Sequence, residues 1–563
     1  DWSKILEAAQ SLKSVSVEEK REFQRYLAGI GIKDGKPNSV SSILNDQNLR
    51  EYLSELTFPV YNVKDFDNLS IPFRAMATDL VEGKEVILSK GSLAFAMRSS
   101  MSLPAVFNPM NYEKTILVDG GVMNNFPTDI AKQMGADIII GSDVGGGMEP
   151  IEKLNNFATV LMQTSMFPSN IKNPANRALC DILVDHLPNL RFSTADFAES
   201  DEIYKDGKIA AEQNLPALIA LAQKLKGYPQ RTHELPKMPN EFIIDTIVYK
   251  NISKENIPLV MARTNLKTHT KYTTKDLFSG LNRAMGTNLF DQITYNHFIT
   301  DEGKLGIVLT AFEHAKNQVN ASLHFDTYRG VGLILNYTAR NVLAESSRLL
   351  ITADIAEQPK ARINFQKNFG KNKDWWWGSE LYGAFLKQEI FINGKSADNM
   401  LYNAFEFNNE ANRNLNSLKS YIGLGLNYNY TEVKPKNDPN LNPNILSLNN
   451  YNFEDIEINI HYSYNDMDKV FFATNGTILR ANINRSLFSD TNINYTDTNL
   501  TDYSGQTNGF TKFGLGFEKR LQLKKKVTCI MGFDTKIILQ DKLEDGDVSF
   551  YDDGYASKYV LGR

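Results

Sequence analysis

Residues 421–430 read YIGLGLNYNY and residues 455–464 read DIEINIHYSY. In both stretches the even-numbered residues are isoleucine, leucine or tyrosine, while most residues between them are glycine or polar. Alternation with a period of two places the apolar side chains on one face of a β-strand. A tilted strand of about 9–11 residues crosses a hydrocarbon layer of ~30 Å, with aromatic side chains at the headgroup level. The two stretches therefore predict membrane-crossing strands.

Weaker copies of the pattern follow one another from Asn320 onward. They lie near 320–326, 331–338, 348–355, 360–367, 378–387, 401–408, 476–485, 510–519 and 526–536. Together the segments predict about eleven antiparallel strands, with long connections at 431–454 and 486–509. A soluble β-sandwich also alternates, but the wholly polar second face and the unequal connections favour a transmembrane β-barrel. Since an odd count leaves an edge unpaired in lipid, we expect part of the barrel to lie outside this chain.

A different order of elements precedes these strands. The pattern predicts a β-α-α-β-β unit with a strand at Phe242–Tyr249, helices at Asn256–Asn265 and Thr274–Met285, and a hairpin of Gln292–Ile299 with Lys304–Glu313. A stretch rich in proline and polar residues between 228 and 239 predicts a domain boundary before this unit.

The first 230 or so residues alternate helical and strand patterns, which predicts an α/β region. We expect a helix at Trp2–Arg25, a strand at Phe73–Leu80, a helix at Ser92–Ser100 and a strand at Thr115–Val118. The run ADIIIG at 136–141 is apolar almost throughout, as in a parallel sheet covered on both faces.

Composition excludes several classes of function. The 563 residues carry 61 Lys and Arg against 66 Asp and Glu, a net charge of −5, so nucleic acid is not an expected partner. The two cysteines, Cys180 and Cys529, have no metal-ligand spacing, and the seven histidines are scattered without an HExxH pattern. The sequence predicts no metal site, no cofactor and no disulfide framework.

One sharp local motif occurs in the α/β region, VDGGV at 118–122. An apolar strand delivers the Asp119 carboxylate to a strand end, and Gly120 and Gly121 permit close approach of other backbone. Asp-Gly is also a common turn dipeptide, so the motif alone does not separate a catalytic carboxylate from a simple turn.

The neighbouring motifs resemble the second half of a patatin-like phospholipase domain. They are FRAMATDL at 73–80, AMRSS at 96–100, LPAVFNP at 103–109, DGG at 119–121 and NFP at 125–127. The resemblance covers about residues 1–227. It implies hydrolysis of phospholipid acyl esters by a Ser–Asp dyad, in which Asp119 is the aspartate and Gly120 and Gly121 support the motif.

The nucleophile of such a dyad sits in a GxSxG elbow, which this chain lacks. GSDVG at 141–145 has its serine one place too early, and Ser99 and Ser100 have no flanking elbow glycines. In the family the elbow and a Gly-rich oxyanion loop precede the region that begins here. We therefore expect both upstream of Asp1, and we expect the chain to be incomplete at both ends and inert as given.

The β-α-α-β-β unit followed by a barrel resembles a single POTRA module in the outer-membrane assembly and secretion family, whose barrels have sixteen strands. The whole order resembles the patatin-type autotransporters of Gram-negative bacteria (type V secretion, subclass d). The resemblance implies a patatin-like domain at 1–237, a POTRA module at 238–317 and an incomplete outer-membrane barrel at 318–563. Implied partners are phospholipid substrate, outer-membrane lipids and protein partners in a membrane complex. The alternative is a transport or assembly protein whose patatin-like domain is an inactive plug or partner-binding module.

Overall fold

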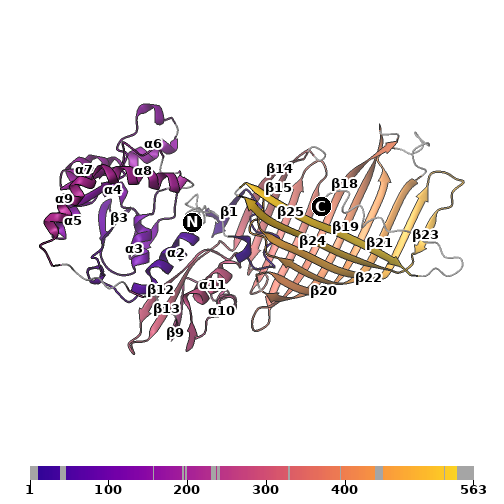
Figure 1. The fold of residues 1–563 in the computed structure, drawn as a ribbon. Helices are drawn as coiled ribbons and strands as arrows, with labels where there is room; N and C mark the ends of the chain where they lie inside the picture. Colours follow the sequence, from indigo (N-terminus) through magenta and orange to yellow (C-terminus); the bar gives the residue numbers. More distant parts are fainter. Residues whose placement is uncertain are drawn as a thin grey trace.

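The structure has three regions, an α/β region, a small β-α-α-β-β unit and a large curved sheet, and the unit lies between the other two (Figure 1). The structure is a computed structural model. It describes residues 11–33, 35–38, 46–104, 106–155, 157–192, 196, 199–229, 236–237, 241–326, 330–392, 395–416, 418–437, 448–524 and 526–541. Among these residues, no helix combines the length and apolar character needed to cross a membrane.

The large sheet is an antiparallel meander. Its strands after residue 316 are β14 (Asn317–Asp326), β15 (Gly330–Arg340), β16 (Ser347–Ile355), β17 (Lys360–Phe369), β18 (Trp375–Ile392), β19 (Lys395–Asn416), β20 (Ser420–Pro435), β21 (Leu448–Asn465), β22 (Gly476–Tyr495), β23 (Tyr503–Gln506), β24 (Phe510–Lys524) and β25 (Val527–Gln540). All but the short β23 lie side by side in chain order, which confirms the eleven strands expected from the alternation. Because they form one continuous sheet, the sandwich alternative is wrong.

Exposure across this sheet is the reverse of that in a soluble protein. On β20, the side chains of Ile422, Leu424 and Leu426 are 43%, 51% and 50% exposed. On the opposite face of the neighbouring β21, Asp455 and Glu457 are only 1% and 2% exposed. An apolar outer face with a polar interior is the pattern of a barrel whose strands face hydrocarbon.

The strands run further than their alternation indicated. β20 and β21 pair as far as Val433 with Tyr451, and residues 438–447 between them lie outside the described part. β22 likewise continues to Tyr495, and β23 folds back onto it. Within the described residues, the expected long connections at 431–454 and 486–509 thus contain strand at 431–435, 448–454, 486–495 and 503–506, because the ladder hydrogen bonds continue beyond the aromatic rows. No described strand joins the sheet's two ends, so closure with sixteen strands stays a prediction.

The middle unit keeps the predicted strand, two helices and hairpin, but the expected first strand is divided in two, and a further short strand lies between the helices. Its elements are β9 (Phe242–Ile244), β10 (Thr246–Lys250), α10 (Ile257–Thr264), β11 (Thr270–Tyr272), α11 (Thr274–Met285), β12 (Phe290–Ile299) and β13 (Leu305–Glu313). β10 pairs parallel to β13, and β12 pairs antiparallel to β13, which leaves β12 at the sheet edge. α11 begins with a capping box between Thr273 and Asp276, and its apolar face packs into the core over the sheet.

The α/β region holds two small sheets. Its elements are α2 (Gln47–Thr57), η2 (Phe58–Val60), η3 (Phe66–Asn68), β3 (Ala75–Asp79), β4 (Lys84–Leu88), α3 (Leu93–Ser100), β5 (Met110–Tyr112), β6 (Thr115–Asp119), α4 (Gly121–Asn124), α5 (Thr128–Gln133), β7 (Ile140–Asp143), η4 (Ile151–Lys153), α6 (Phe157–Ser165), α7 (Phe167–Arg177), β8 (Ile182–Asp185), α8 (Ser200–Gln213) and α9 (Leu215–Leu225). The sheet β4-β3-β6-β5 is antiparallel, not parallel as expected, because tight turns join β3 to β4 and β5 to β6. Among the described strands of this region, β7 and β8, which are linked through helices, pair in parallel, and β7 contains the end of the apolar run at 136–141.

The N-terminal segment corrects a second expectation. Instead of one helix at Trp2–Arg25, the described part has a short η1 (Leu12–Ser14) followed by turns through Gln24. β1 (Ala28–Lys33) then pairs antiparallel with β14, and β2 (Lys36–Asn38) pairs with β1, so both extend the large sheet (Figure 1). The helical spacing of this segment did not determine its structure, because its charged side chains bind residues of the distant sheet.

Candidate active site

Asp119 stands at the end of the central antiparallel sheet of the α/β region. Its strand, β6, pairs with the fully buried β3, so Ala77 lies opposite Asp119. The Asp119 N–H donates to the Ser102 carbonyl at 2.9 Å, and the Thr78 hydroxyl donates to the Asp119 carbonyl at 3.0 Å. Both contacts hold the backbone, which leaves the half-buried carboxylate to be positioned separately.

The two glycines after Asp119 are required by close contacts. A Cβ at Gly120 would come within 2.4 Å of the Met76 carbonyl oxygen. A Cβ at Gly121 would lie 2.7 Å from the Asn125 Oδ1 atom, and the Gly121 N–H donates to Asp119 Oδ1 at 2.7 Å. The glycines thus bring backbone against Met76 and against the Asp119 carboxylate, an arrangement that a turn and a catalytic site share.

The surroundings of Asp119 shift the pKa of its carboxyl. Burial raises the pKa of its carboxyl, and the Gly121 N–H and the Arg98 guanidinium oppose this effect. Arg98 is itself only 1% exposed, and its Nε donates to the Asp46 carboxylate at 2.7 Å. A carboxylate with a raised pKa is a stronger base, which suits it to accept a hydroxyl proton.

Arg98 also links Asp119 to the segment before it. Its Nη1 donates to the Ser102 hydroxyl at 2.8 Å, and the Ser102 carbonyl is the group that accepts the Asp119 N–H. Arg50 donates to the same Asp46 carboxylate at 2.8 Å. Nothing in the spacing of these residues revealed this network, because Arg98 and Asp46 are 52 positions apart.

One serine–histidine contact was not predicted from the sequence motifs. Ser142, rejected as an elbow serine, lies at the end of β7, with its hydroxyl 2.9 Å from His186 Nε2 at the end of β8. The parallel pairing of β7 with β8, which was not predicted from the sequence, brings the two residues together. Ser142 is exposed, and within the described ranges no acid is hydrogen-bonded to the other nitrogen of His186, so this pair lacks an orienting third group.

The arrangement supplies a base without a nucleophile. A neutral hydroxyl attacks poorly until a base within hydrogen-bond reach removes its proton, and Asp119 is the residue predicted for that role. Within the described part of the chain, no group of three or more His, Cys, Asp or Glu side chains could hold a metal ion. The roles of Asp119, Gly120 and Gly121 stay predictions.

Comparison with known proteins identifies the surrounding domain. Residues 5–132 match the family model "Patatin-like phospholipase", so the chain carries a patatin-like phospholipase domain. The match includes residues 11–33, which in this structure lie against the large sheet and the middle unit.

Curated relatives resemble the chain over short stretches. The patatin-like phospholipase domain-containing protein 7 of Mus musculus is 34% identical over 104 residues, which is 18% of this chain and 8% of the relative. An uncharacterized NTE family protein of Mycobacterium bovis is 31% identical over 108 residues, which is 19% of this chain and 29% of the relative. The chain thus spans less than a third of either relative.

A solved structure also aligns with the chain. BamA from Haemophilus ducreyi lacking POTRA domains 1–3 covers 57% of this chain and 58% of its own, at 11% identity and a TM-score of 0.37. This likeness is too low to support the fold. The assignment of the barrel rests instead on the strand pairing and side-chain exposure described above.

Proposed function

We propose that this chain belongs to an outer-membrane lipid acyl hydrolase, in which the patatin-like domain cleaves phospholipid acyl esters with Asp119 as the base of a Ser–Asp dyad. The dyad serine lies outside these 563 residues. The observation that carries the proposal is the fixed, half-buried Asp119 carboxylate, whose Oδ1 accepts the Gly121 N–H at 2.7 Å within the region that matches the family. No cofactor is required.

The middle unit and the large sheet anchor the hydrolase domain in the membrane. We assign residues 1–237 to the patatin-like domain, 238–317 to a POTRA module and 318–563 to a barrel in the Gram-negative outer membrane, the order of a patatin-type autotransporter. The apolar outer face of the large sheet supports this location, because such a face is stable only against hydrocarbon or another protein. Its partners are then phospholipid substrate, outer-membrane lipids and proteins of a membrane complex.

The test is hydrolysis of a fluorogenic phospholipid by the full-length protein in vesicles. Asp119→Asn keeps the shape of the side chain but cannot accept the proton, so we expect kcat/KM to fall by about 100-fold or more. Asp137→Asn is the matched control, since Asp137 is exposed in the same region. Undiminished hydrolysis by Asp119→Asn would reject the assignment of this residue.

The alternative function, a transport or assembly protein with an inactive patatin-like domain, makes a different prediction. It requires that the wild-type full-length protein leave the phospholipid uncleaved while it still folds into vesicles. A GxSxG elbow in the sequence that precedes residue 1 would favour the hydrolase, and its absence would favour the alternative.

A further inference from the structure

The polar face of the large sheet carries a row of buried arginines. Arg340 on β15, Arg348 on β16 and Arg362 on β17 are 8%, 5% and 6% exposed. Arg340 and Arg348 are direct cross-strand partners. Two like charges placed opposite each other repel, and a buried charge without a counter-ion is costly, so this face requires an anion.

Carboxylates of the N-terminal segment meet this requirement. Glu19 Oε2 accepts from Arg340 at 3.0 Å and from Arg348 at 2.6 Å. Glu22 Oε1 accepts from Arg362 at 2.7 Å. Both glutamates are less than 10% exposed, so these ion pairs are shielded from water.

A third carboxylate joins the sheet to the middle unit. Glu18 Oε1 accepts from Arg263 of α10 at 2.7 Å, and both side chains are buried. Glu18 Oε2 accepts from the Asn414 amide of β19 at 3.0 Å. One short segment therefore contacts the barrel wall and the β-α-α-β-β unit at the same time.

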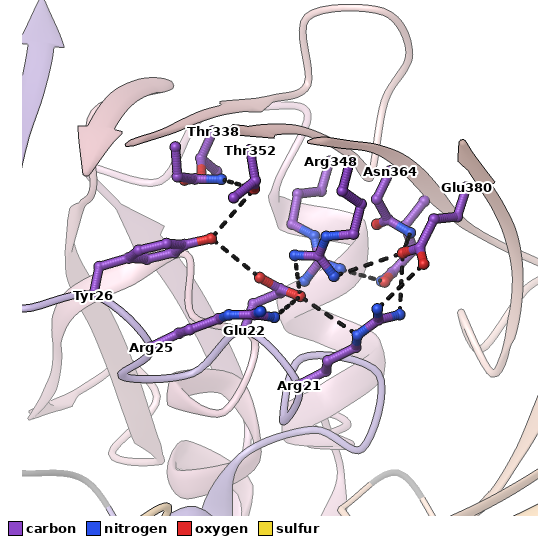
Figure 2. Close-up of polar contacts among 12 residues, drawn as sticks. Arg21, Glu22, Arg25, Tyr26, Thr338, Arg348, Thr352, Asn364 and Glu380 are labelled. Carbon is purple, nitrogen blue, oxygen red and sulfur yellow. Dashed lines mark hydrogen bonds and ion pairs between the residues drawn. The ribbon is translucent and has the colours of Figure 1, made fainter. Parts of the chain in front are cut away.

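Residues at the edges of this contact region also form pairs. Arg21 donates to both oxygens of Glu380 on β18, at 3.0 and 3.2 Å, and the Tyr26 and Thr352 hydroxyls are 3.4 Å apart (Figure 2). Leu12 and Phe23 pack against Met467, which lies in the connection between β21 and β22. Ion pairs, hydrogen bonds and apolar contacts thus hold the segment against the sheet.

We propose that Arg340, Arg348 and Arg362 on the polar face of the barrel, together with Arg263 on α10 of the middle unit, form a carboxylate-binding site. Its ligand is segment 15–26 of the same chain, which presents the carboxylates of Glu18, Glu19 and Glu22. Seated there, the segment tethers the patatin-like domain to the barrel independently of hydrolysis at Asp119. The family match over residues 5–132 suggests the competing arrangement, in which these residues pack within the α/β domain.

Cysteine crosslinking in the full-length protein in vesicles distinguishes the two arrangements. Arg21→Cys with Glu380→Cys, in a background with Cys180→Ser and Cys529→Ser, should be joined within minutes by a short bis-maleimide, which spans the length of an arginine–glutamate pair where a disulfide does not. Arg21→Cys with Lys387→Cys is the control, since Lys387 is seven residues further along β18, roughly 23 Å away. Trapping no faster than in the control would overturn the proposal.

A charge exchange tests the chemistry of recognition. Glu22→Arg places a fifth cation beside Arg362, and we expect it to lower the yield of the Arg21–Glu380 trapping pair at least several-fold. Adding Arg362→Glu restores the opposite charges and should recover most of the yield. Glu345→Arg, at an exposed position between β15 and β16, should have no effect. A yield insensitive to Glu22→Arg, or a loss that Arg362→Glu does not recover, would contradict a carboxylate site.

Discussion

Gln47 forms two reciprocal hydrogen bonds with the backbone of Ile293. Its Nε2 donates to the Ile293 carbonyl at 2.9 Å, and its Oε1 accepts the Ile293 N–H at 3.1 Å. β12 is an edge strand, so a side-chain amide from α2 takes the place of a neighbouring strand at this point. The contact docks the α/β region onto the middle unit and covers part of an edge that would otherwise accept another chain.

Loss of this amide should open the edge. Gln47→Ala leaves a buried N–H and a buried carbonyl without their partner, and we expect a loss of about 1–3 kcal/mol in the stability of the interface. Hydrogen exchange at the Ile293 amide measures it directly. Gln133→Ala, at an exposed helix position, is the control. Unchanged protection of Ile293 in Gln47→Ala would show that the amide does not hold the edge.

The buried pair of Arg98 and Asp46 makes a second prediction. Arg98→Met removes the cation but leaves Asp46 buried, so we expect a loss of about 3–5 kcal/mol in unfolding free energy. Arg74→Met is the control, because the Arg74–Asp67 pair lies at the surface and should contribute no more than about 1 kcal/mol. Denaturant titrations compare the two variants. Equal, small losses would show that Asp46 is stabilised by Arg50 alone.

The barrel strands and the middle unit were predictable from sequence because their signals are local. A period of two, as in 455–464, reports which side chains share a face, whatever the strand pairs with. The helix at Thr274–Met285 was equally predictable from its spacing. Asp119 at a strand end followed from an apolar run and two glycines.

What the sequence could not reveal depends on partners far along the chain. Glu19 and Arg340 are 321 positions apart, and Glu22 and Arg362 are 340 apart. A charged segment with helical spacing looks the same whether its carboxylates face water or a buried arginine row. The contact of Arg98 with Asp46 was hidden for the same reason, because ion pairing between distant elements leaves no periodic trace.

His297 should make the middle unit sensitive to acid. Aromatic rings of Phe58, Tyr61 and Tyr295 surround it with ring centroids 4.9 Å away, and its Nε2 is buried without a hydrogen-bond partner. Burial, aided by Lys64, lowers the pKa of His297 to about 3. Its neutral form thus contributes stability that is complete above pH ~6.5 and is lost as the pH falls toward 3.

The pH profile of unfolding checks this expectation. Between pH ~6.5 and ~4 the wild-type unfolding free energy should fall by at most about 1.4 kcal/mol per pH unit from this group, and His297→Phe should remove that component. His269→Gln changes an exposed histidine and should leave the slope intact. A slope unaltered by His297→Phe would assign the acid sensitivity to other groups.

Inverted exposure of the large sheet predicts which face tolerates charge. Leu424 points to the outer face and is 51% exposed, whereas Asn427, three residues along β20, faces the polar interior. We expect Leu424→Lys to reduce the stability of the protein folded in vesicles by about 2–4 kcal/mol if this position lies near the bilayer centre, because hydrocarbon does not solvate an ammonium group. Asn427→Lys should cost much less, since its ammonium group stays in a polar interior. Denaturant titration of vesicle-folded protein measures both, and equal tolerance of the two substitutions would mean that the outer face is not in contact with lipid.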